Sequence, residues 1–578
     1  MADQELSTRT IVGMEIHVQL RTNTKLFCAC PVVFDAPPNS CTCEVCLGHP
    51  GALPVINRRA VEFAILTGLA LQCEIASHTK WDRKSYYYPD LPKNYQISQY
   101  DLPIAQRGHF DIEVAGRTRR IRIRRAHLEE DAGKNIHDAG EGTLVDLNRA
   151  GTPLLEIVTE PDIASPEEAF VFCTELQRLV RHLGVSEASM QKGQMRFEPN
   201  VNVAITADGR EFRTPIAEVK NINSFRFVRQ AIEFEQQRQT AQWQADHGYV
   251  IGQRPNENRG WNAQRGVTEF QRGKEAAHDY RYFPDPDLLP IEVSAAMLDG
   301  LRAKLPEPPL VRRTRLVREY GLSPDDAELI VDDRPAADFF EQVLAAGAPP
   351  ELAAKQFVNI WMKLAGDRAP ALVDSSRADP ARAAPSREGL PLTRRPSGSP
   401  HSGAASAASR RVKGKGAVAP NGDQARCVNR DREGADLNAG PAASPFAKGG
   451  PSRVDAGFTL DPARIAELAR ITADGVISRT AAAQVAQAML DDPQSPRTIA
   501  ERLGLLQVRD TGATQAWVDQ AFAENAQAVQ DALANPKKAK AAAGFLRGQV
   551  MKISGGKADP RITGELIDRQ LAALRTPQ

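Results

Sequence analysis

The sequence predicts an α+β protein in which sheet structure dominates the first half of the chain and helices the second. Residues 1–295 are dense in alternating apolar and polar positions, which is the period of a strand with one buried face. Residues 296–367 and 456–578 instead carry apolar side chains every three or four positions, as a helix with one buried face does. A chain of 578 residues has room for roughly two to four domains, so we expect these parts to be separate units.

The strands of the first part are predicted from alternation. Between Ile11 and Leu20 the apolar side chains fall on one face, and Glu15 and His17 fall on the other. Residues 119–125 alternate in the same way, and residues 201–205 form a strand that ends at an Asp-Gly turn signal. Because positions i and i+2 of a strand share a face, the Glu15 carboxylate and the His17 imidazole should lie on one side of the sheet.

Helices are expected within the first part at 58–71, at 225–239 and after Ser165, where Ser-Pro-Glu-Glu is an N-cap signal. Later helices are predicted by apolar spacing at 325–331 and 350–364 and by the caps Asp461-Pro462 and Ser495-Pro496.

Residues 368–455 separate the two helical parts and have a different composition. The stretch from Arg394 is rich in serine, proline, glycine and alanine and has almost no large apolar residues. Such a segment cannot bury enough surface to offset the entropy cost of ordering, so we predict that it is disordered.

The overall composition is that of a soluble globular protein, with 42% hydrophobic and 25% charged residues. The sequence contains no run of about twenty apolar residues, so no membrane span is predicted. The N-terminus lacks the basic and apolar regions of a secretory signal. We therefore expect a cytoplasmic protein. The net charge of +1 does not point to a nucleic-acid partner, which would have to bind through local basic faces.

Five of the eight cysteines lie close together, a pattern that in a cytoplasmic chain indicates metal binding before disulfides. Two close pairs joined by a short loop predict a structural zinc site with four thiolates and no open position for catalysis. The alternative is a set of reduced cysteines without metal. Cys41 is a possible substitute for Cys43, His49 is a weaker ligand candidate, Cys427 stands alone, and Cys73 and Cys173 are expected to be inert core thiols. The predicted ligands are Cys28, Cys30, Cys43 and Cys46.

Several carboxylates are grouped with histidines. Glu15 with His17, the run His127-Leu-Glu-Glu-Asp131 and the segment from Asp146 to Glu156 place like charges at a density that needs a cation or solvent. Carboxylate oxygens suit Mg²⁺, which in nucleotide enzymes bridges protein and phosphates. The alternative for each residue is a solvated surface carboxylate.

Two stretches combine basic residues with patterns suited to nucleic acid. Residues 81–99 interleave aromatics such as Tyr88 with cations such as Lys93, which can stack on bases and neutralise phosphates, or form a tyrosine-rich core strand. The tail carries Lys537, Lys538 and Lys552, which can grip a phosphate backbone or form a solvated basic face. No phosphate loop, dinucleotide turn or amidase signature is present, so residue chemistry alone does not reach a reaction.

A family resemblance supplies what these patterns do not. Several long strings are similar, in the same order, to the B subunits of bacterial aspartyl/glutamyl-tRNA amidotransferases, and the similarity covers about 8–366 and 457–578. The strings are Val12–Leu20, Tyr88–Gln99, His127–Lys134, Val145–Asp162, Glu218–Phe225 and His278–Pro284.

The resemblance implies a large cradle-shaped catalytic domain with mixed and antiparallel sheet, an all-helical domain and a small helical tail that contacts tRNA. It implies ATP and Mg²⁺ as cofactors, and Glu-tRNA(Gln) and/or Asp-tRNA(Asn) as substrates. Because zinc cysteines are not universal in the family, the zinc site predicted from the cysteine spacing is expected to be structural. The resemblance further implies a carbon–nitrogen ligase that works in a heterotrimer. In that complex an amidase A subunit delivers ammonia from glutamine, and a small C subunit is the third member.

Carried onto this chain, the resemblance implies roles for particular residues. The catalytic candidates are Glu15, His17, Glu130 and Arg149, and the Mg²⁺ candidates are Glu15, His17, Glu129, Glu130 and Glu156. The substrate-binding candidates are Lys93, Tyr88, Arg196 and Asn200, and the tRNA-binding candidates of the tail are Lys537, Lys538 and Lys552.

The chain departs from the family at one motif. Relatives commonly read Arg-Cys-Asp-Ala-Asn-Val where this chain reads Arg196-Phe-Glu-Pro-Asn-Val201, so Arg196 and Asn200 remain while the Cys and Asp do not.

The alternative functions are a non-catalytic, zinc-containing RNA-binding module and an independent metallohydrolase. A closed four-thiolate site and the lack of a water-activating zinc triad disfavour the hydrolase.

Overall fold

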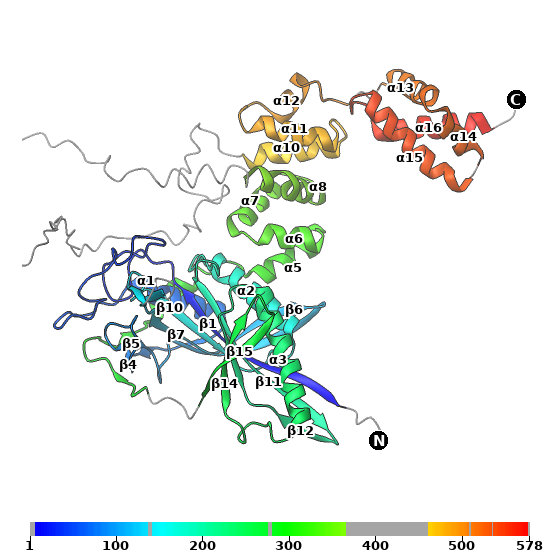
Figure 1. Cartoon of the computed structure of the whole chain (residues 1–578). Helices are drawn as coiled ribbons and strands as arrows, with labels where there is room; N and C mark the ends of the chain where they lie inside the picture. The colour runs from blue at the N-terminus through cyan, green and yellow to red at the C-terminus, as the bar shows by residue number, and fades with distance from the viewer. Residues whose placement is uncertain are drawn as a thin grey trace, which may run out of the picture.

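The predicted α+β class is confirmed in the computed structural model, where a sheet-rich region precedes a helical one (Figure 1). The structure describes residues 6–136, 142–274, 280–365, 461–507, 510–534 and 536–575. The segment predicted to be disordered, 368–455, lies outside the described residues, and Cys427 lies outside them with it. No helix in the described ranges is long and apolar enough to span a lipid bilayer.

A ten-stranded sheet organises the first region. Its order is β15-β14-β13-β11-β1-β10-β7-β6-β2, with β12 paired to β11, and only the β13–β14 pair is parallel. The strands are β1 Ser7–Gln19, β2 Glu74–Ile75, β6 Ala105–Val114, β7 Arg117–Glu130, β10 Pro153–Thr159, β11 Met195–Ala207, β12 Arg210–Arg213, β13 Ala217–Lys220, β14 Asn256–Asn262 and β15 Val267–Lys274. The first strand of the chain therefore lies in the middle of the sheet, between β10 and β11.

Smaller sheets border this one. The orders are β16-β4-β5, β17-β3 and β8-β9. The strands are β3 His78–Thr79, β4 Asp82–Ser85, β5 Tyr95–Ser98, β8 Lys134–Ile136, β9 Leu144–Asp146, β16 Phe283–Pro284 and β17 Ile291–Glu292. Arg83 fixes the returning segment on β4, because its guanidinium lies 2.7 Å from Asp285 and over the ring of Tyr95.

Three helices build the core with the apolar face of the large sheet. They are α1 Arg58–Ala70, α2 Pro166–His182 and α3 Phe225–Ala245, close to the predicted positions. Ser165 caps α2 as expected, since its hydroxyl accepts a hydrogen bond from the Glu168 amide. Met14 and Ile16 of β1 are fully buried in the same core, so Glu15 and His17 face the other side.

One core of the helical region contains side chains from elements on both sides of residues 366–460. Helices α10–α12 share one core with α5–α8 and η1, although spacing had grouped everything after residue 456 in the tail. Conversely, α4 packs on α1, because Leu301 belongs to the core of the sheet region. The spacing of apolar residues predicts which face of a helix is buried, but it does not predict which other element packs on that face. The elements are α4 Ala295–Arg302, α5 Pro309–Tyr320, α6 Pro324–Val331, α7 Arg334–Ala345, α8 Pro350–Gln356, η1 Phe357–Trp361, α10 Pro462–Ala473, α11 Arg479–Met489 and α12 Pro496–Arg502.

The last four helices form a core of their own (Figure 1). They are α13 Thr511–Glu524, α14 Ala526–Ala534, α15 Pro536–Ile553 and α16 Pro560–Arg575. Of the basic residues predicted to bind tRNA, Lys552 is exposed near the end of α15. Lys537 and Lys538 fall in the first turn of the same helix, and their side chains lie outside the described part of the structure.

Helix α2 joins the sheet region to the helical region. The His182 ring, 1% exposed, lies with Nε2 2.6 Å from the Val331 carbonyl oxygen of α6, and Arg334 donates to the His182 carbonyl. The buried Arg178 guanidinium donates to Glu175 on α2 and to Asp332 just after α6. Polar contacts of this kind fix the orientation of α2 against α6.

The outward face of β7 carries arginines at alternate positions, and each is paired. Arg120 lies 2.8 Å from Asp111 of β6, Arg122 lies 2.6 Å from Asp162, and Arg124 lies 3.0 Å from Glu160. We call these three pairs the arginine ladder.

Candidate active site

Strand pairing collects polar side chains on the face of the large sheet opposite the core. His17 of β1 lies opposite Glu156 of β10, which lies opposite His127 of β7. On the other side of β1, Glu15 lies opposite Glu198 of β11. Directly opposed residues share a face, so one polar surface crosses four neighbouring strands.

The first group on this surface is the His17 cluster, which consists of His17, Glu129 and Glu156. The His17 Nε2 atom lies 3.4 Å from Glu129 Oε1 and 3.5 Å from Glu156 Oε2, and all three side chains are largely buried. His127 lies beside them, with Nε2 3.6 Å from Glu156 Oε2. Three predicted Mg²⁺ ligands are therefore brought together.

Burial alone would lower the pKa of His17, but hydrogen bonds to Glu129 and Glu156 outweigh burial and raise the pKa to about 10. Burial also opposes ionisation of Glu156, yet His127 and His17 lower the pKa of this carboxyl to about 2. The same histidines, with Lys84, hold the pKa of Glu129 well below its usual range despite its burial. Both carboxylates are thus ionised at neutral pH, and with no metal bound His17 carries a proton, which a cation held by the two carboxylates would displace.

Lys84 of β4 is a second cation of the His17 cluster. Burial by itself would lower the pKa of Lys84, but Glu129 and Glu156 raise it above its ordinary value. The ammonium lies 5.0 Å from the ring centre of Tyr280, within cation–π range. Burial raises the pKa of the neighbouring Tyr282 hydroxyl to about 12, which keeps it protonated.

The second group, the Glu15 cluster, consists of Glu15, Glu198 and Glu218. One carboxylate oxygen from each lies within 4.8 Å of the others. Lys220 donates at 2.8 Å to both Glu198 and Glu218, and Asn200 Nδ2 donates to Glu15 at 3.1 Å. Glu15 and His17 therefore share a face as predicted but belong to different clusters, because β1 meets β11 on one side and β10 on the other.

Glu130, a predicted metal ligand, belongs to neither cluster. It follows Glu129 directly in β7, so its side chain points to the opposite face. There it forms a buried ion pair with Lys93 and accepts a hydrogen bond from the Ile97 amide at 2.9 Å. The structure thus joins Glu130 to Lys93 and separates both from the other predicted ligands.

Arg149 and Arg196, predicted to contact substrate, meet at Asp131, which the sequence analysis placed in a carboxylate run but gave no role in the site. Arg196 Nη2 lies 3.2 Å and Arg149 Nε 3.3 Å from the buried Asp131. Arg149 also donates to the carbonyls of Ala132 and Gly133. The Asp131 Oδ2 atom lies in the ion pair with Arg149, although the pair does not meet hydrogen-bond geometry. The Arg196 Nε atom is buried and has no hydrogen-bond partner among the described residues, and because buried donors are normally paired it leaves a donor for a ligand.

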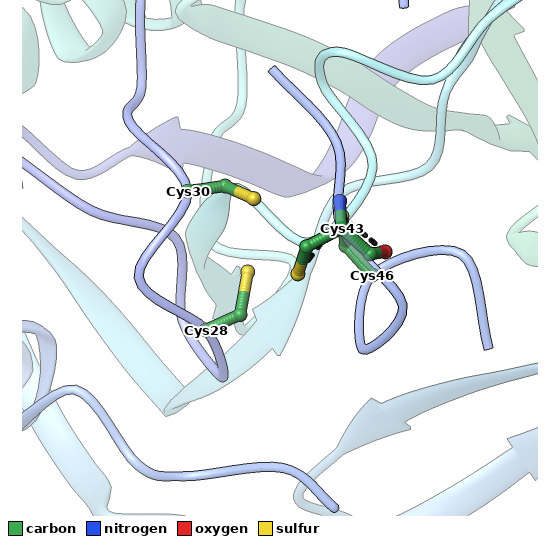
Figure 2. A group of neighbouring side chains, drawn as sticks. All are labelled: Cys28, Cys30, Cys43 and Cys46. Carbon is green, nitrogen blue, oxygen red and sulfur yellow. Dashed lines mark hydrogen bonds between the residues drawn. The ribbon is translucent and has the colours of Figure 1, made fainter. Parts of the chain in front are cut away.

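The cysteine knuckle, made of the four predicted zinc ligands, is assembled as expected. Sulfur atoms of Cys28, Cys30, Cys43 and Cys46 all lie within 4.8 Å of one another and converge from two loops (Figure 2). The Cys43 and Cys46 sulfurs are 3.9 Å apart. This is close to the edge of a tetrahedron with Zn–S bonds of about 2.3 Å, so the donor set fits Zn²⁺. Cys41 and His49 are not part of the group.

Lys25 lies behind the knuckle and is fully buried. Its Nζ atom lies 3.4 Å from Cys46 Sγ and 3.4 Å from the Leu147 carbonyl oxygen. A hydrogen bond from Cys28 and the Lys25 ammonium lower the pKa of Cys46, which favours the thiolate that a metal requires.

The carboxylates of both clusters suit a hard divalent cation, and in the Glu15 cluster Lys220 already neutralises part of the charge on Glu198 and Glu218. The donors of the two clusters are mainly carboxylate oxygens, as Mg²⁺ prefers. In the His17 cluster, Glu129 Oε2 and His17 Nδ1 are buried without a hydrogen-bond partner within the described ranges. Tyr88, another predicted substrate contact, is 58% exposed and lies outside both clusters.

The fold and the site place this chain in a known class. Residues 10–299 match the family model of the GatB/GatE catalytic domain, and residues 453–571 match the model of the GatB domain. The first model thus covers the large sheet with helices α1–α3, and the second covers α10–α15 and most of α16.

Curated relatives give the particular family. The chain is 40% identical over 570 residues to the B subunit of the aspartyl/glutamyl-tRNA(Asn/Gln) amidotransferase of Geobacter sulfurreducens, a match that covers 98% of this chain and 100% of the relative. It is 39% identical to the corresponding protein of Brevibacillus brevis over 98% of this chain and 99% of the relative. With that of Rhodopirellula baltica it shares 51% identity over 60% of this chain and 71% of the relative. The chain belongs to the family of B subunits of this tRNA-dependent amidotransferase.

Proposed function

We propose that this chain uses ATP to activate the side-chain carboxylate of mischarged Glu-tRNA(Gln), Asp-tRNA(Asn) or both, so that ammonia can convert it to the amide. The observation that carries the proposal is the pair of carboxylate clusters on one face of the sheet, two residues apart along β1. Such a surface binds cations that in turn hold phosphates.

The reaction needs activation because a carboxylate is a poor electrophile. An oxygen of the aminoacyl side chain attacks the γ-phosphorus of ATP, ADP leaves, and an acyl phosphate forms. Ammonia then attacks the carbonyl carbon, phosphate leaves with the electrons of the C–O bond, and loss of a proton from nitrogen gives the amide. Preorganised positive charge around the transferring phosphoryl group supplies most of the acceleration.

Residues of this chain have distinct roles in the proposal. The His17 and Glu15 clusters hold Mg²⁺, which when bound neutralises negative charge on the phosphates. Arg149 and Arg196 bind a phosphate or carboxylate of the substrates, and the buried Asp131 holds both guanidiniums in place. Lys84 adds positive charge beside Glu129. Lys93 is charge-paired with Glu130 on the other face, which favours a role outside phosphate binding.

The proposal includes partners. No amidase signature lies in the chain, so ammonia comes from the A subunit of a heterotrimer in which the small C subunit is the third member. The tail helices α13–α16 bind tRNA through basic residues such as Lys552, and the setting is the cytoplasm, where translation takes place. The cysteine knuckle holds Zn²⁺ in a structural role.

Amide formation tests the proposal. The chain would be assembled with its A and C subunits and supplied with glutamine, Mg²⁺ and radiolabelled Glu-tRNA(Gln) or Asp-tRNA(Asn), with and without ATP. We expect amide product only with ATP, and the tRNA that responds defines the specificity. Glu129→Gln should lower the rate by at least about a hundredfold while tRNA binding is retained. Glu160→Gln, on the exposed arginine ladder, is the matched control and should leave the rate unchanged.

A binding-only RNA module is the competing function. It predicts tRNA binding by the assembled complex with no ATP-dependent amide product. Full activity of Glu129→Gln would instead show that the reaction occurs but that the His17 cluster does not hold the phosphates.

A further inference from the structure

The cysteine knuckle is docked on the segment that carries Arg149. This segment, residues 145–149, leaves the short strand β9 and leads to β10. Asn39, in the loop between the two cysteine pairs, accepts a hydrogen bond from the Leu147 amide at 2.8 Å and donates from Nδ2 to the Val145 carbonyl at 3.1 Å. Its own amide donates to Asp146 at 3.0 Å. One residue thus holds three consecutive residues of the segment.

Asn148 makes the reciprocal contact from the segment to the knuckle loop. Its Oδ1 atom accepts from the Cys41 amide at 2.8 Å, and its Nδ2 atom donates to the Pro37 carbonyl at 2.7 Å. Two asparagines therefore interlock the two stretches of chain, although about a hundred residues separate them in sequence. Side chains that satisfy backbone groups in this way replace the pairing that a sheet would provide.

A third connection runs through Lys25. Its ammonium bridges the Cys46 sulfur and the Leu147 carbonyl oxygen, at 3.4 Å from each. The neighbouring Leu26 amide donates to the Gly151 carbonyl at 2.8 Å. The thiol group and the backbone beside Arg149 are thus joined through one buried cation.

On its far side the same segment reaches the active site. Arg149 extends to Asp131 and to the carbonyls of Ala132 and Gly133. The position of the Arg149 guanidinium depends on both ends of the side chain. Asp131 holds the guanidinium itself, and the cysteine knuckle holds the backbone of the 145–149 segment. A displacement of about 1 Å in a group that contacts substrate lowers a rate by up to about a hundredfold.

We propose that the cysteine knuckle is a positioning device for Arg149, and that Asn39 and Asn148 are the positioning residues through which it acts. The inference deepens the proposed function, since it rests on Arg149 contacting the substrates. It gives the closed four-thiolate site a role in the reaction without any contact with the reacting atoms. Metal loading joins the two cysteine pairs on either side of Asn39, and so keeps that loop in the shape that fits the 145–149 segment.

The variants are chosen to remove the interlock alone. Asn39 has a positive φ of 59°, so Asn39→Gly keeps the backbone conformation and removes only the side-chain hydrogen bonds. Asn148→Ala removes the reciprocal pair. Ser40→Ala is the matched control, because it removes a hydroxyl that donates to Pro37 within the knuckle loop but leaves the Pro37 carbonyl able to accept from Asn148. Zinc content and melting temperature of each variant report whether the knuckle and the fold are intact.

Two measurements on the assembled heterotrimer test the inference. In hydrogen exchange, the Leu147 amide should exchange about tenfold faster in Asn39→Gly and after zinc chelation, and at the normal rate in Ser40→Ala. In transamidation, kcat/KM should fall by about ten- to a hundredfold in Asn39→Gly and Asn148→Ala with zinc retained. Combining Asn148→Ala with Arg149→Ala should cause no loss beyond that of Arg149→Ala alone, because the asparagine acts through the arginine.

The outcomes separate this inference from the proposed function. If Arg149→Ala abolishes transamidation but both asparagine variants keep wild-type kcat/KM and Leu147 exchange, the positioning role is refuted and the proposed function stands. Additive losses in the double variant refute it as well, since the asparagine would then act elsewhere. If Arg149→Ala is fully active, the role of Arg149 fails and the inference fails with it.

Discussion

The stability of the contact between α2 and α6 should depend on pH through His182. The imidazole is 1% exposed, and burial lowers its pKa to about 4, with the nearby guanidiniums of Arg312, Arg334 and Arg178 acting in the same direction. The hydrogen bond to the Val331 carbonyl requires a proton on Nε2 only, while Nδ1 is buried without a partner in the described part of the chain. The folded protein therefore holds a neutral ring.

The size of the effect follows from linkage. In the unfolded chain the imidazole has its ordinary pKa of about 6.5, so between about pH 6.5 and pH 4 the unfolded state binds a proton that the folded state does not. Stability is therefore lost as the pH falls through this window. The contribution of His182 to the free energy of unfolding should drop by about 2 kcal/mol between pH 7 and pH 5, and by about 3 kcal/mol at pH 4.

His182→Gln is the matched variant, because its amide can still donate to the Val331 carbonyl but does not titrate. Urea unfolding followed by tryptophan fluorescence at pH 7, pH 6 and pH 5 would give the difference between the two proteins at each pH. The wild type should lose about 2 kcal/mol more than the variant by pH 5. Parallel losses in both proteins would refute the reasoning, since His182 would then not be the group that takes up the proton.

Two further substitutions test the buried charges. Asp131→Asn keeps the shape of the side chain but removes the charge shared by Arg149 and Arg196, so transamidation should fall by about ten- to a hundredfold while tRNA binding, measured by filter retention, is kept. Glu235 is fully buried between Arg238 and Arg259, so Glu235→Gln should lower the free energy of unfolding in urea by about 3–5 kcal/mol. Glu233→Gln, on the exposed face of the same helix, should change it by less than about 1 kcal/mol.

Local patterns predicted the elements well and their partners less well. Alternation between Ile11 and Leu20 correctly predicted the β1 strand and the shared face of Glu15 and His17. The same period of two could have separated Glu129 from Glu130, because adjacent positions of a strand face opposite sides of the sheet. The prediction placed both in one metal set because that set was carried over from the family resemblance, without regard to the period of the strand.

The rest of the site depends on contacts between distant segments. Glu198 joins the Glu15 cluster because β11 pairs with β1 in one register, and Glu218 joins it because β13 pairs with β11. Local sequence does not specify a register across nearly two hundred positions. The alternation of Glu198 and Asn200 was a usable signal, since it repeats the pattern of Glu15 and His17. Lys25 carried no such signal, because a lysine beside an apolar run is usually exposed.

The arginine ladder of β7 bears on how the proposed binding of tRNA would respond to salt. A strand with an arginine at nearly every outward position would normally create a positive stripe that attracts any polyanion. Here Arg120, Arg122 and Arg124 each face a carboxylate already, so the stripe is close to neutral. Such pairs release no counterions when RNA arrives, and they contribute nothing to the slope of binding against salt concentration. If the chain binds tRNA as proposed, nonspecific RNA gains little affinity at β7, and discrimination among tRNAs depends on cations elsewhere on the surface.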